Sequence, residues 1–177
     1  MVRVGFIGAG VVGTALAVRL KEKGYPVVAI ASRTTESAEK LAEAVIGCQV
    51  YDKKQSVADI ADLVFVTTPD DDVQEVVAEL NWRPGQSVIH CSGVDSLDVL
   101  QKAKADGAYV GGFHPLQSFA SATNAIENLP GSTFALEAEE PLLDTLKGMS
   151  HALEGNHVAL GLGDKALYHA AAVIACN

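Results

Sequence analysis

Short apolar runs alternate with longer amphipathic stretches along the first half of the chain. The runs at residues 2–7, 27–31 and 63–66 contain almost no polar side chains, which is typical of parallel strands buried on both faces. Between the first two runs, Val11 to Lys23 has a helical composition, and Gly24 supplies a C-terminal cap. This pattern predicts strands joined by crossover helices.

The alternation continues to the end of the chain. It predicts helices at Glu36 to Ile46, Asp70 to Leu80 and about Ser96 to Ala105. It also predicts a strand in SVIHCSG that ends in Cys91 to Gly93, a strand in AYVGGFHP, and a strand, a helix and a further strand within residues 132–155 and before residue 161. Residues 161–177 predict the start of a long apolar helix. We therefore expect an α/β fold of the Rossmann type, with a doubly wound, mainly parallel sheet, in residues 1–158, and a separate helical segment in residues 159–177.

A glycine motif stands between the first strand and the first helix. The sequence GFIGAGVVG places Gly8, Gly10 and Gly13 in the spacing G-x-G-x-x-G, inside a strand-helix-strand unit of about 30 residues. In a dinucleotide site these glycines allow a tight turn, close approach of a pyrophosphate and close helix packing, and the helix start supplies free N–H groups. A purely structural turn is the alternative. A secretory signal is another, because Arg3 precedes a charge-free run, although glycines interrupt that run.

The end of the second strand bears on which dinucleotide would bind. NAD sites usually carry an acidic residue there, about 20 residues after the glycines, to bind the ribose 2′-hydroxyl. This chain has Ser32, Arg33 and Thr34 instead, 19 to 21 residues after Gly13. A guanidinium and two hydroxyls suit a 2′-phosphate, so NADP is favoured. The alternative is that Thr34 or Thr35 only caps the next helix and Arg33 is a solvated surface charge.

Several polar residues follow predicted strands. In an open α/β sheet, ligands bind outside the carboxyl ends of the strands, where Thr68, Ser92 and His114 all fall. The three aspartates at residues 70–72 could suggest a metal, but acidic residues are also normal in the first turn of a helix, and no metal site is expected.

Three residues are candidates for proton transfer. His114 precedes Pro115, which favours an extended backbone and a fixed direction for the imidazole. Lys165 and His169 lie one turn apart on the predicted last helix. The alternatives are a histidine bonded within its own turn and a lysine that extends along the surface.

Composition narrows the class of partner. The formal net charge of −9 argues against broad attraction to nucleic acid or to an anionic membrane, and no apolar segment reaches the length of a membrane span. The 3 cysteines have neither metal-ligand nor paired disulfide spacing, which favours the reducing cytoplasm. We expect a cytoplasmic protein whose ligands are small molecules.

These motifs resemble a known superfamily. GFIGAGVVG, ASRT, VTTPDDDV, HCSG, GFHPLQSFA and KALYHAAAVIACN are similar to segments of prephenate dehydrogenases, 3-hydroxyisobutyrate-type β-hydroxyacid dehydrogenases and deazaflavin-dependent NADP reductases. The resemblance is closest to a branch of Rossmann-like oxidoreductases whose second half is a helical domain of unknown function. It implies hydride transfer between NADP and a small carbonyl, hydroxyacid or imine substrate. With the motifs above, it gives as expected cofactor-binding residues Gly8, Ala9, Gly10, Val11, Val12, Gly13, Ser32, Arg33, Thr34, Thr67, Thr68, Pro69, Ser92 and Gly93.

The chain also departs from these families. β-Hydroxyacid dehydrogenases carry a catalytic lysine followed four residues later by asparagine, whereas Lys165 is followed at that offset by His169. The related branch continues into a helical bundle that closes the substrate site and pairs subunits, and residues 159–177 would be only the start of that domain. We therefore expect a homodimer through the exposed last helix.

Two other functions stay open as hypotheses. One is a dinucleotide-binding module without turnover. The other is a methyltransferase that uses S-adenosylmethionine, against which Arg33 argues.

Overall fold

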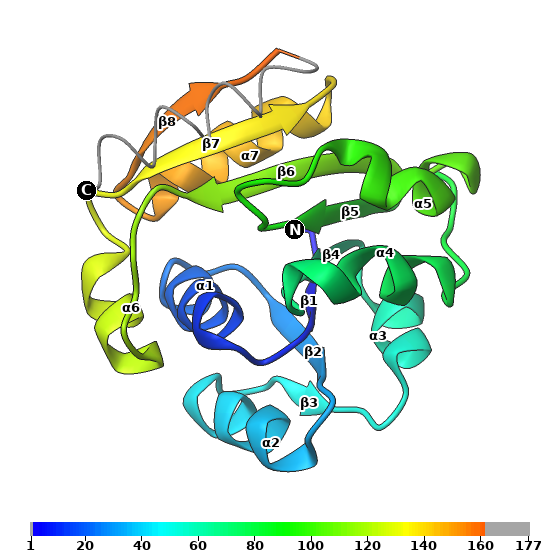
Figure 1. Ribbon diagram of the computed structural model, residues 1–177. Coiled ribbons are helices and arrows are strands. Elements are labelled where there is room, and N and C mark those ends of the chain that lie inside the picture. The colour runs from blue at the N-terminus through cyan, green and yellow to red at the C-terminus, as the bar shows by residue number, and fades with distance from the viewer. Residues whose placement is uncertain (1, 162–177) are drawn as a thin grey trace.

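The computed structural model describes residues 2–161, which form an eight-stranded sheet flanked by helices on both faces (Figure 1). The strand order is β3-β2-β1-β4-β5-β6-β7-β8. All neighbouring strands are parallel except β6 and β7. The strands are β1 (Val4–Ile7), β2 (Val27–Ala31), β3 (Gln49–Val50), β4 (Leu63–Val66), β5 (Ser87–His90), β6 (Tyr109–Pro115), β7 (Thr133–Ala138) and β8 (Asn156–Ala159).

The helices divide between the two faces of the sheet. One hydrophobic core joins the sheet to α1 (Val11–Glu22), α2 (Thr35–Ala44), α6 (Ala122–Asn128) and α7 (Leu142–Ala152). The other core joins it to α3 (Lys54–Ile60), α4 (Asp70–Ala78), the 3-10 helix η1 (Leu97–Leu100) and α5 (Gln101–Ala105). Because helices cover both faces of the sheet, every residue of β1 and β4 is buried, and both strands are continuous apolar runs in the sequence.

A row of aromatic rings crosses the first of these cores. Phe6 of β1 stacks on Phe65 of β4 with ring centroids 5.2 Å apart. Phe113 of β6 lies 5.8 Å from Phe65 and 4.6 Å from Phe134 of β7. All four side chains are fully buried, and burial of one such ring contributes roughly 1.5–3 kcal/mol to folding. The row of rings therefore packs the antiparallel pair β6 and β7 against the parallel strands β1 and β4.

The sheet reverses its winding direction at β1. This strand lies between β2 and β4, and Ile7 is in register with Ala31 on one side and Val66 on the other. The carboxyl ends of the three strands therefore lie level, and the connections that leave β1 and β4 diverge to opposite faces. Such a switch point opens a crevice at the sheet edge.

The Rossmann-type α/β fold expected from the sequence is confirmed. The strands at 27–31 and 63–66 have the predicted bounds, and α1 ends one residue before its predicted end. The sequence reading missed β3, α3 and α6. Each is short, and the polar side chains at the start of α3 and throughout α6 hide a periodic apolar face.

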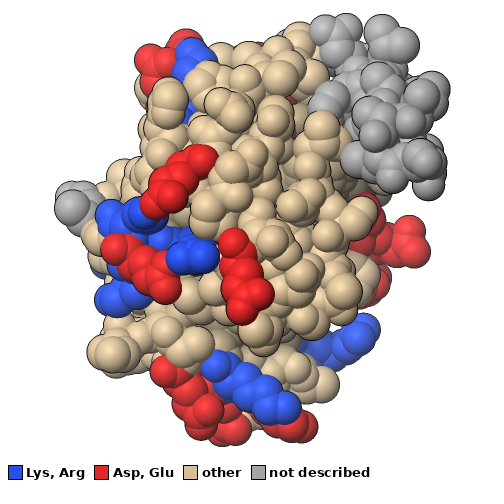
Figure 2. All heavy atoms as spheres, turned by 90° about the vertical axis from the view of Figure 1, so that its left-hand side faces the viewer, with Lys and Arg blue, Asp and Glu red and all other residues tan. Residues whose placement is uncertain are grey.

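Charges of both signs are interspersed on the face that carries α6 (Figure 2). Arg19 pairs with Glu22, and Lys23 pairs with Glu154. Local pairing of this kind leaves no broad basic patch on that face of the described residues. Within residues 2–161, the helices are too short or too polar to cross a membrane.

Candidate functional site

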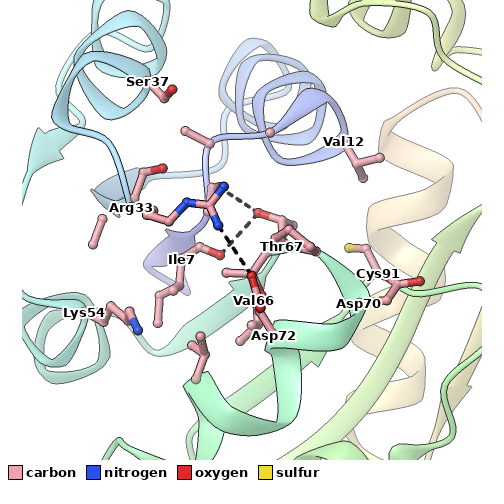
Figure 3. Close-up of a pocket in the computed structure, with 18 of the residues that line it drawn as sticks. Ile7, Val12, Arg33, Ser37, Lys54, Val66, Thr67, Asp70, Asp72 and Cys91 are labelled. Carbon is pink, nitrogen blue, oxygen red and sulfur yellow. Dashed lines mark hydrogen bonds and ion pairs between the residues drawn. The ribbon is translucent and has the colours of Figure 1, made fainter.

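A cleft of about 630 Å³ opens at the carboxyl ends of β1, β2 and β4 (Figure 3). The first turn of α1 forms one wall and α4 forms the opposite wall. Of the expected cofactor-binding residues, the cleft is lined by Gly8, Ala9, Gly10, Val11, Val12, Ser32, Arg33, Thr34, Thr67, Thr68, Pro69 and Ser92. Gly13 and Gly93 lie behind this lining rather than in it.

Two glycines of the motif are required by packing inside the protein. Gly8 has φ +108°, and a Cβ atom there would lie 2.6 Å from the backbone carbonyl of Thr67. A Cβ atom on Gly13 would lie 2.4 Å from Thr67 Oγ1 and 2.7 Å from Gly8 O. Neither position has room for a side chain, so both residues let α1 and the end of β4 approach the turn closely.

Thr67 fastens this turn to β4. Its hydroxyl donates a hydrogen bond to the carbonyl oxygen of Gly8 at 2.7 Å and lies 3.5 Å from that of Ile7. The backbone N–H of Thr67 also donates to Ile7 O. The hydroxyl of Thr67 thus holds the glycine turn together, and its expected role in cofactor binding stays a prediction.

Gly10 is different, because packing inside the protein does not require a glycine there. Its φ of −77° is open to any residue, and within residues 2–161 a Cβ atom would meet only Thr67 O, at 3.8 Å. Gly10 lines the cleft at the N-cap of α1. A side chain here would project into the space from which a ligand approaches the helix start.

The start of α1 is suited to an anion. Its N-cap makes no side-chain hydrogen bond, its first turn has no acidic residue, and Arg19 and Lys21 stand in its last turn. The first N–H groups of an α-helix have no partner within the helix, and the helix dipole places partial positive charge beside them. Phosphate oxygens fit this end of the helix.

Thr68 presents a buried hydroxyl at the floor of the cleft. Among the described residues, its Oγ1 atom is shielded from solvent and has no hydrogen-bond partner. Leaving such a group unsatisfied costs about 1–3 kcal/mol, so a ligand that bonded to it would recover this energy. Among the described residues the neighbouring threonines thus differ: the hydroxyl of Thr67 is bonded within the fold, and the hydroxyl of Thr68 is buried without a partner.

Arg33 projects from the end of β2 at the rim of the cleft (Figure 3). Its side chain is 85% exposed, and its Nη1 atom lies 3.9 Å from Asp72 Oδ2 of α4. Thr34 donates its hydroxyl hydrogen to Ser37 Oγ at 2.7 Å and makes no side-chain cap bond to α2. Arg33, Thr34 and Ser37 therefore gather polar groups at one end of the cleft.

Sequence reasoning did not place in the site the lining residues that come from α2, α3, α4 and the C-cap of α4, namely Ser37, Lys54, Asp70, Asp72, Glu75, Val76 and Glu79. Lys54 begins α3, and its ammonium lies 3.0 Å from Glu79 Oε2 on α4. No short motif marks these residues, because α3 packs against β1 and β2, α4 follows β4, and only the folded sheet brings their side chains to one cleft.

A polar clip closes the other end of the cleft. Ser92, just after β5, donates its hydroxyl hydrogen to Asp70 Oδ2 at 2.9 Å. Ser92 Oγ in turn accepts hydrogen bonds from the backbone N–H groups of Val94 and Asp95, at 3.2 and 3.1 Å. The hydroxyl of Ser92 thus connects the start of α4 to the loop after β5, and its expected role in cofactor binding stays a prediction.

His114 lies behind that loop, near the end of β6. A Cβ atom on Gly93 would lie 2.7 Å from His114 Nε2, so the imidazole packs directly on the glycine backbone. Gly93 thereby brings the ring next to Ser92 and Cys91, which line the cleft. The other two candidates for proton transfer, Lys165 and His169, lie outside the described residues.

The chain matches two family models. Residues 3–93 match the family described as NADP oxidoreductase, coenzyme F420-dependent. Residues 132–177 match a domain of unknown function, DUF2520. No curated protein is similar enough in sequence to count as a match.

Solved structures share the fold over nearly the whole chain. BF3122 from Bacteroides fragilis, provisionally assigned as an NADP oxidoreductase, is 27% identical with a TM-score of 0.81, over 99% of this chain and 67% of its own. TM1727 from Thermotoga maritima is 28% identical with a TM-score of 0.76, over 97% and 62%. A reductive aminase from Aspergillus terreus, in complex with NADPH and ethyl levulinate, is 18% identical with a TM-score of 0.78, over 99% and 61%. The chain thus spans 61–67% of the length of these proteins.

Proposed function

The chain belongs to the family of coenzyme F420-dependent NADP oxidoreductases, whose cofactor is NADP, and from this premise we propose that it transfers hydride between NADP(H) bound in the cleft and a small organic substrate. The substrate class proposed is a carbonyl, hydroxyacid or imine compound. Gly10 carries the proposal, because it is a glycine that the fold does not need, at a helix start that faces an open cleft.

The residues of the cleft suit the parts of a dinucleotide phosphate. The N–H groups that begin α1 would hold the pyrophosphate, with Gly10 allowing its approach. Arg33, with Ser32 and Thr34 beside it, would take the 2′-phosphate. The unsatisfied hydroxyl of Thr68 would bond to a polar group of the ligand. These groups orient the molecule and exclude water.

Proton handling is assigned to the opposite end of the cleft. When bound, the cofactor supplies or accepts the hydride, and the protein must provide or remove a proton. His114 is the candidate among the described residues, because its ring packs on Gly93 beside the cleft and an imidazole can donate or accept a proton. Lys165 and His169 stay as sequence-based candidates for the same task, and association through residues 161–177 likewise stays a prediction.

Nicotinamide fluorescence provides the first test. We expect the purified protein to bind NADPH more tightly than NADH, and Arg33→Ala to remove most of this preference by weakening NADPH binding about tenfold or more, as the loss of a charge-assisted phosphate contact implies. Equal binding of both dinucleotides by the native protein would contradict the assignment of Arg33, and binding of neither would contradict the proposed function.

Turnover separates an oxidoreductase from a binding module. The module is the second candidate because most of the expected cofactor-binding residues line the cleft, whereas His114, the described candidate for proton transfer, is not among its lining residues. We expect NADPH oxidation with at least one carbonyl or imine compound, or with oxidised coenzyme F420, which the family's description names. Tight NADPH binding without oxidation by any of these would favour the module.

A further inference from the structure

The two cationic side chains that line the cleft in the described residues both face carboxylates of α4. Arg33 Nη1 lies 3.9 Å from Asp72 Oδ2, and Lys54 Nζ lies 3.0 Å from Glu79 Oε2. Asp72 and Glu79 also share the lining with Glu75, at helical spacings of three and four residues. We call these three residues the acidic face of α4. The wall opposite the helix start of α1 is therefore negatively charged.

The three consecutive aspartates that begin α4 have different surroundings. Asp70 accepts the hydrogen bond from Ser92 and belongs to the clip. Asp72 lines the cleft and approaches Arg33 (Figure 3). Asp71 is exposed and is not part of the cleft lining. Only Asp72 is placed to act on a ligand held by Arg33.

The Arg33–Asp72 pair is loose enough to exchange partners. The arginine side chain is 85% exposed, the aspartate side chain 46% exposed, and 3.9 Å is near the upper limit for an ion pair. Solvent-exposed pairs of this kind contribute little stability. A phosphate that reached the guanidinium would meet weak competition for it, together with repulsion from the carboxylate beside it.

This repulsion depends on the ligand. A 2′-phosphate brings negative charge to Arg33, whereas the 2′-hydroxyl of NAD is neutral and could even donate a hydrogen bond to a carboxylate. The cost imposed by Asp72 therefore falls on NADP rather than on NAD.

Resting on the proposed function, we propose that Asp72 is a specificity-determining residue of this site: it competes with the 2′-phosphate for Arg33 and lowers the preference for NADPH over NADH. The carboxylate keeps Arg33 partnered when no ligand is bound. It also weakens the retention of NADP, which an oxidoreductase must release in each cycle.

The test compares Asp72→Asn with Asp71→Asn. Both substitutions remove one negative charge from the first turn of α4, so they change the net charge and the interaction with the helix dipole equally. In fluorescence titrations we expect Asp72→Asn to bind NADPH about threefold to tenfold more tightly than Asp71→Asn, the range for removing one like charge from an exposed site. NADH should bind both variants equally or should bind Asp72→Asn more weakly.

A second comparison asks whether the effect passes through Arg33. In an Arg33→Ala background, the decrease in log Kd for NADPH caused by Asp72→Asn should be less than half of the decrease that the same substitution causes when Arg33 is present. Adenosine 2′,5′-bisphosphate should follow NADPH in all these variants, and adenosine 5′-monophosphate should follow NADH. These two probes report binding alone, without turnover.

Three results would overturn the inference. The first is that Asp72→Asn and Asp71→Asn bind NADPH with equal affinity. The second is that Asp72→Asn increases the affinity for NADPH and for NADH equally. The third is that the increase in NADPH affinity is the same in the Arg33→Ala background. Titration of the native protein shows which proposal fails. If the native protein binds NADPH selectively and any of these three results is found, only the role of Asp72 is rejected and the proposed function stands.

Discussion

Single atoms distinguish residues of this site that look alike in the sequence. Gly8 and Gly13 are glycines because side chains would collide with Thr67, whereas Gly10 is a glycine without an internal reason. Thr67 and Thr68 are adjacent, but only the first uses its hydroxyl within the fold. Each contrast leads to a pair of variants with opposite expected effects.

Gly10→Ala should separate ligand binding from stability. The backbone of Gly10 accepts alanine, so we expect a loss of at most about 1 kcal/mol in the free energy of unfolding. A methyl group at the helix start should nevertheless weaken NADPH binding about tenfold or more, by keeping phosphate oxygens from the N–H groups. Urea unfolding and nicotinamide fluorescence measure the two effects.

Two further glycines serve as controls for that substitution. Gly8→Ala should cost roughly 2–4 kcal/mol, since it combines a φ of +108° with a backbone collision. Gly148→Ala, in the exposed middle of α7 with open space around it, should stabilise the protein by about 0.5–1 kcal/mol and leave NADPH binding unchanged. If Gly10→Ala binds NADPH as well as the Gly148 variant does, Gly10 is not part of a phosphate site.

The adjacent threonines give a second opposed pair. Thr67→Val removes the hydrogen bond to Gly8 O and should cost about 1–2 kcal/mol of stability. Thr68→Val removes a buried hydroxyl that lacks a partner, so the protein without ligand should be unchanged or up to about 1 kcal/mol more stable, while NADPH binds more weakly. Thermal unfolding with and without NADPH measures both; a destabilised Thr68 variant with unchanged NADPH affinity would refute this reading of Thr68.

At the scale of elements, the cleft depends on how β1 and β4 are held side by side. At their amino ends, Arg3 donates two side-chain hydrogen bonds to Asp62, at 2.8 and 3.1 Å. At their carboxyl ends, Thr67 bonds to the turn after β1. Clamps at both ends keep the two strands in register, and the register places the glycine turn opposite Thr68.

The clamp at the amino ends should make stability depend on pH in the acid range. The hydrogen bonds from Arg3 lower the pKa of Asp62 from its ordinary 3.8 to about 2. Because the pKa is depressed in the folded state, the contribution of Asp62 is fully present above its ordinary pKa and is lost as the pH falls through about 2. Asp62→Asn should therefore be less stable than the native protein at pH 7.

Urea unfolding across the acid range checks this expectation. The difference in midpoint between native protein and Asp62→Asn should be small, because both side chains are about half exposed, and it should shrink between about pH 4 and pH 2. A difference that is constant over this range would mean that the side chain of Asp62 acts through its shape and uncharged contacts rather than its charge. Asp59→Asn, which removes an aspartate from the last turn of α3, is a matched control.

At the scale of the whole molecule, an acidic protein has to bind an anionic ligand. The net charge of −9 gives no general attraction for a dinucleotide phosphate, so binding must come from local groups. The structure supplies these as a helix start, Arg33 and Lys54 in a single cleft. The acidic face of α4 lies across the cleft from these groups. The net electrostatic attraction for an anionic ligand therefore depends on how the fold places the positive and negative groups relative to one another.

The sequence by itself determined the α/β class, the bounds of several elements, the glycine turn and the family, because these depend on local patterns. Continuous apolar runs require burial on both faces, and a left-handed turn requires a glycine. Thr67, Ser92 and Arg33 could be placed near the cleft for the same reason, since strand ends in a parallel sheet share one edge.

Only the tertiary structure decided which of these groups are free for a ligand and which are used by the fold. The hydroxyls of Thr67 and Ser92 are bonded within the protein, and the buried Thr68 hydroxyl has no partner in the part of the chain that the structure describes. Lys54, Asp72 and Glu79 reach the cleft because β1 lies between β2 and β4 in the sheet, so that the helix before β4 and the helix after it both border the carboxyl end of β1. Hydrogen bonds and ion pairs between residues distant in sequence depend on packing geometry to within a fraction of an ångström, and periodicity in the sequence does not encode it.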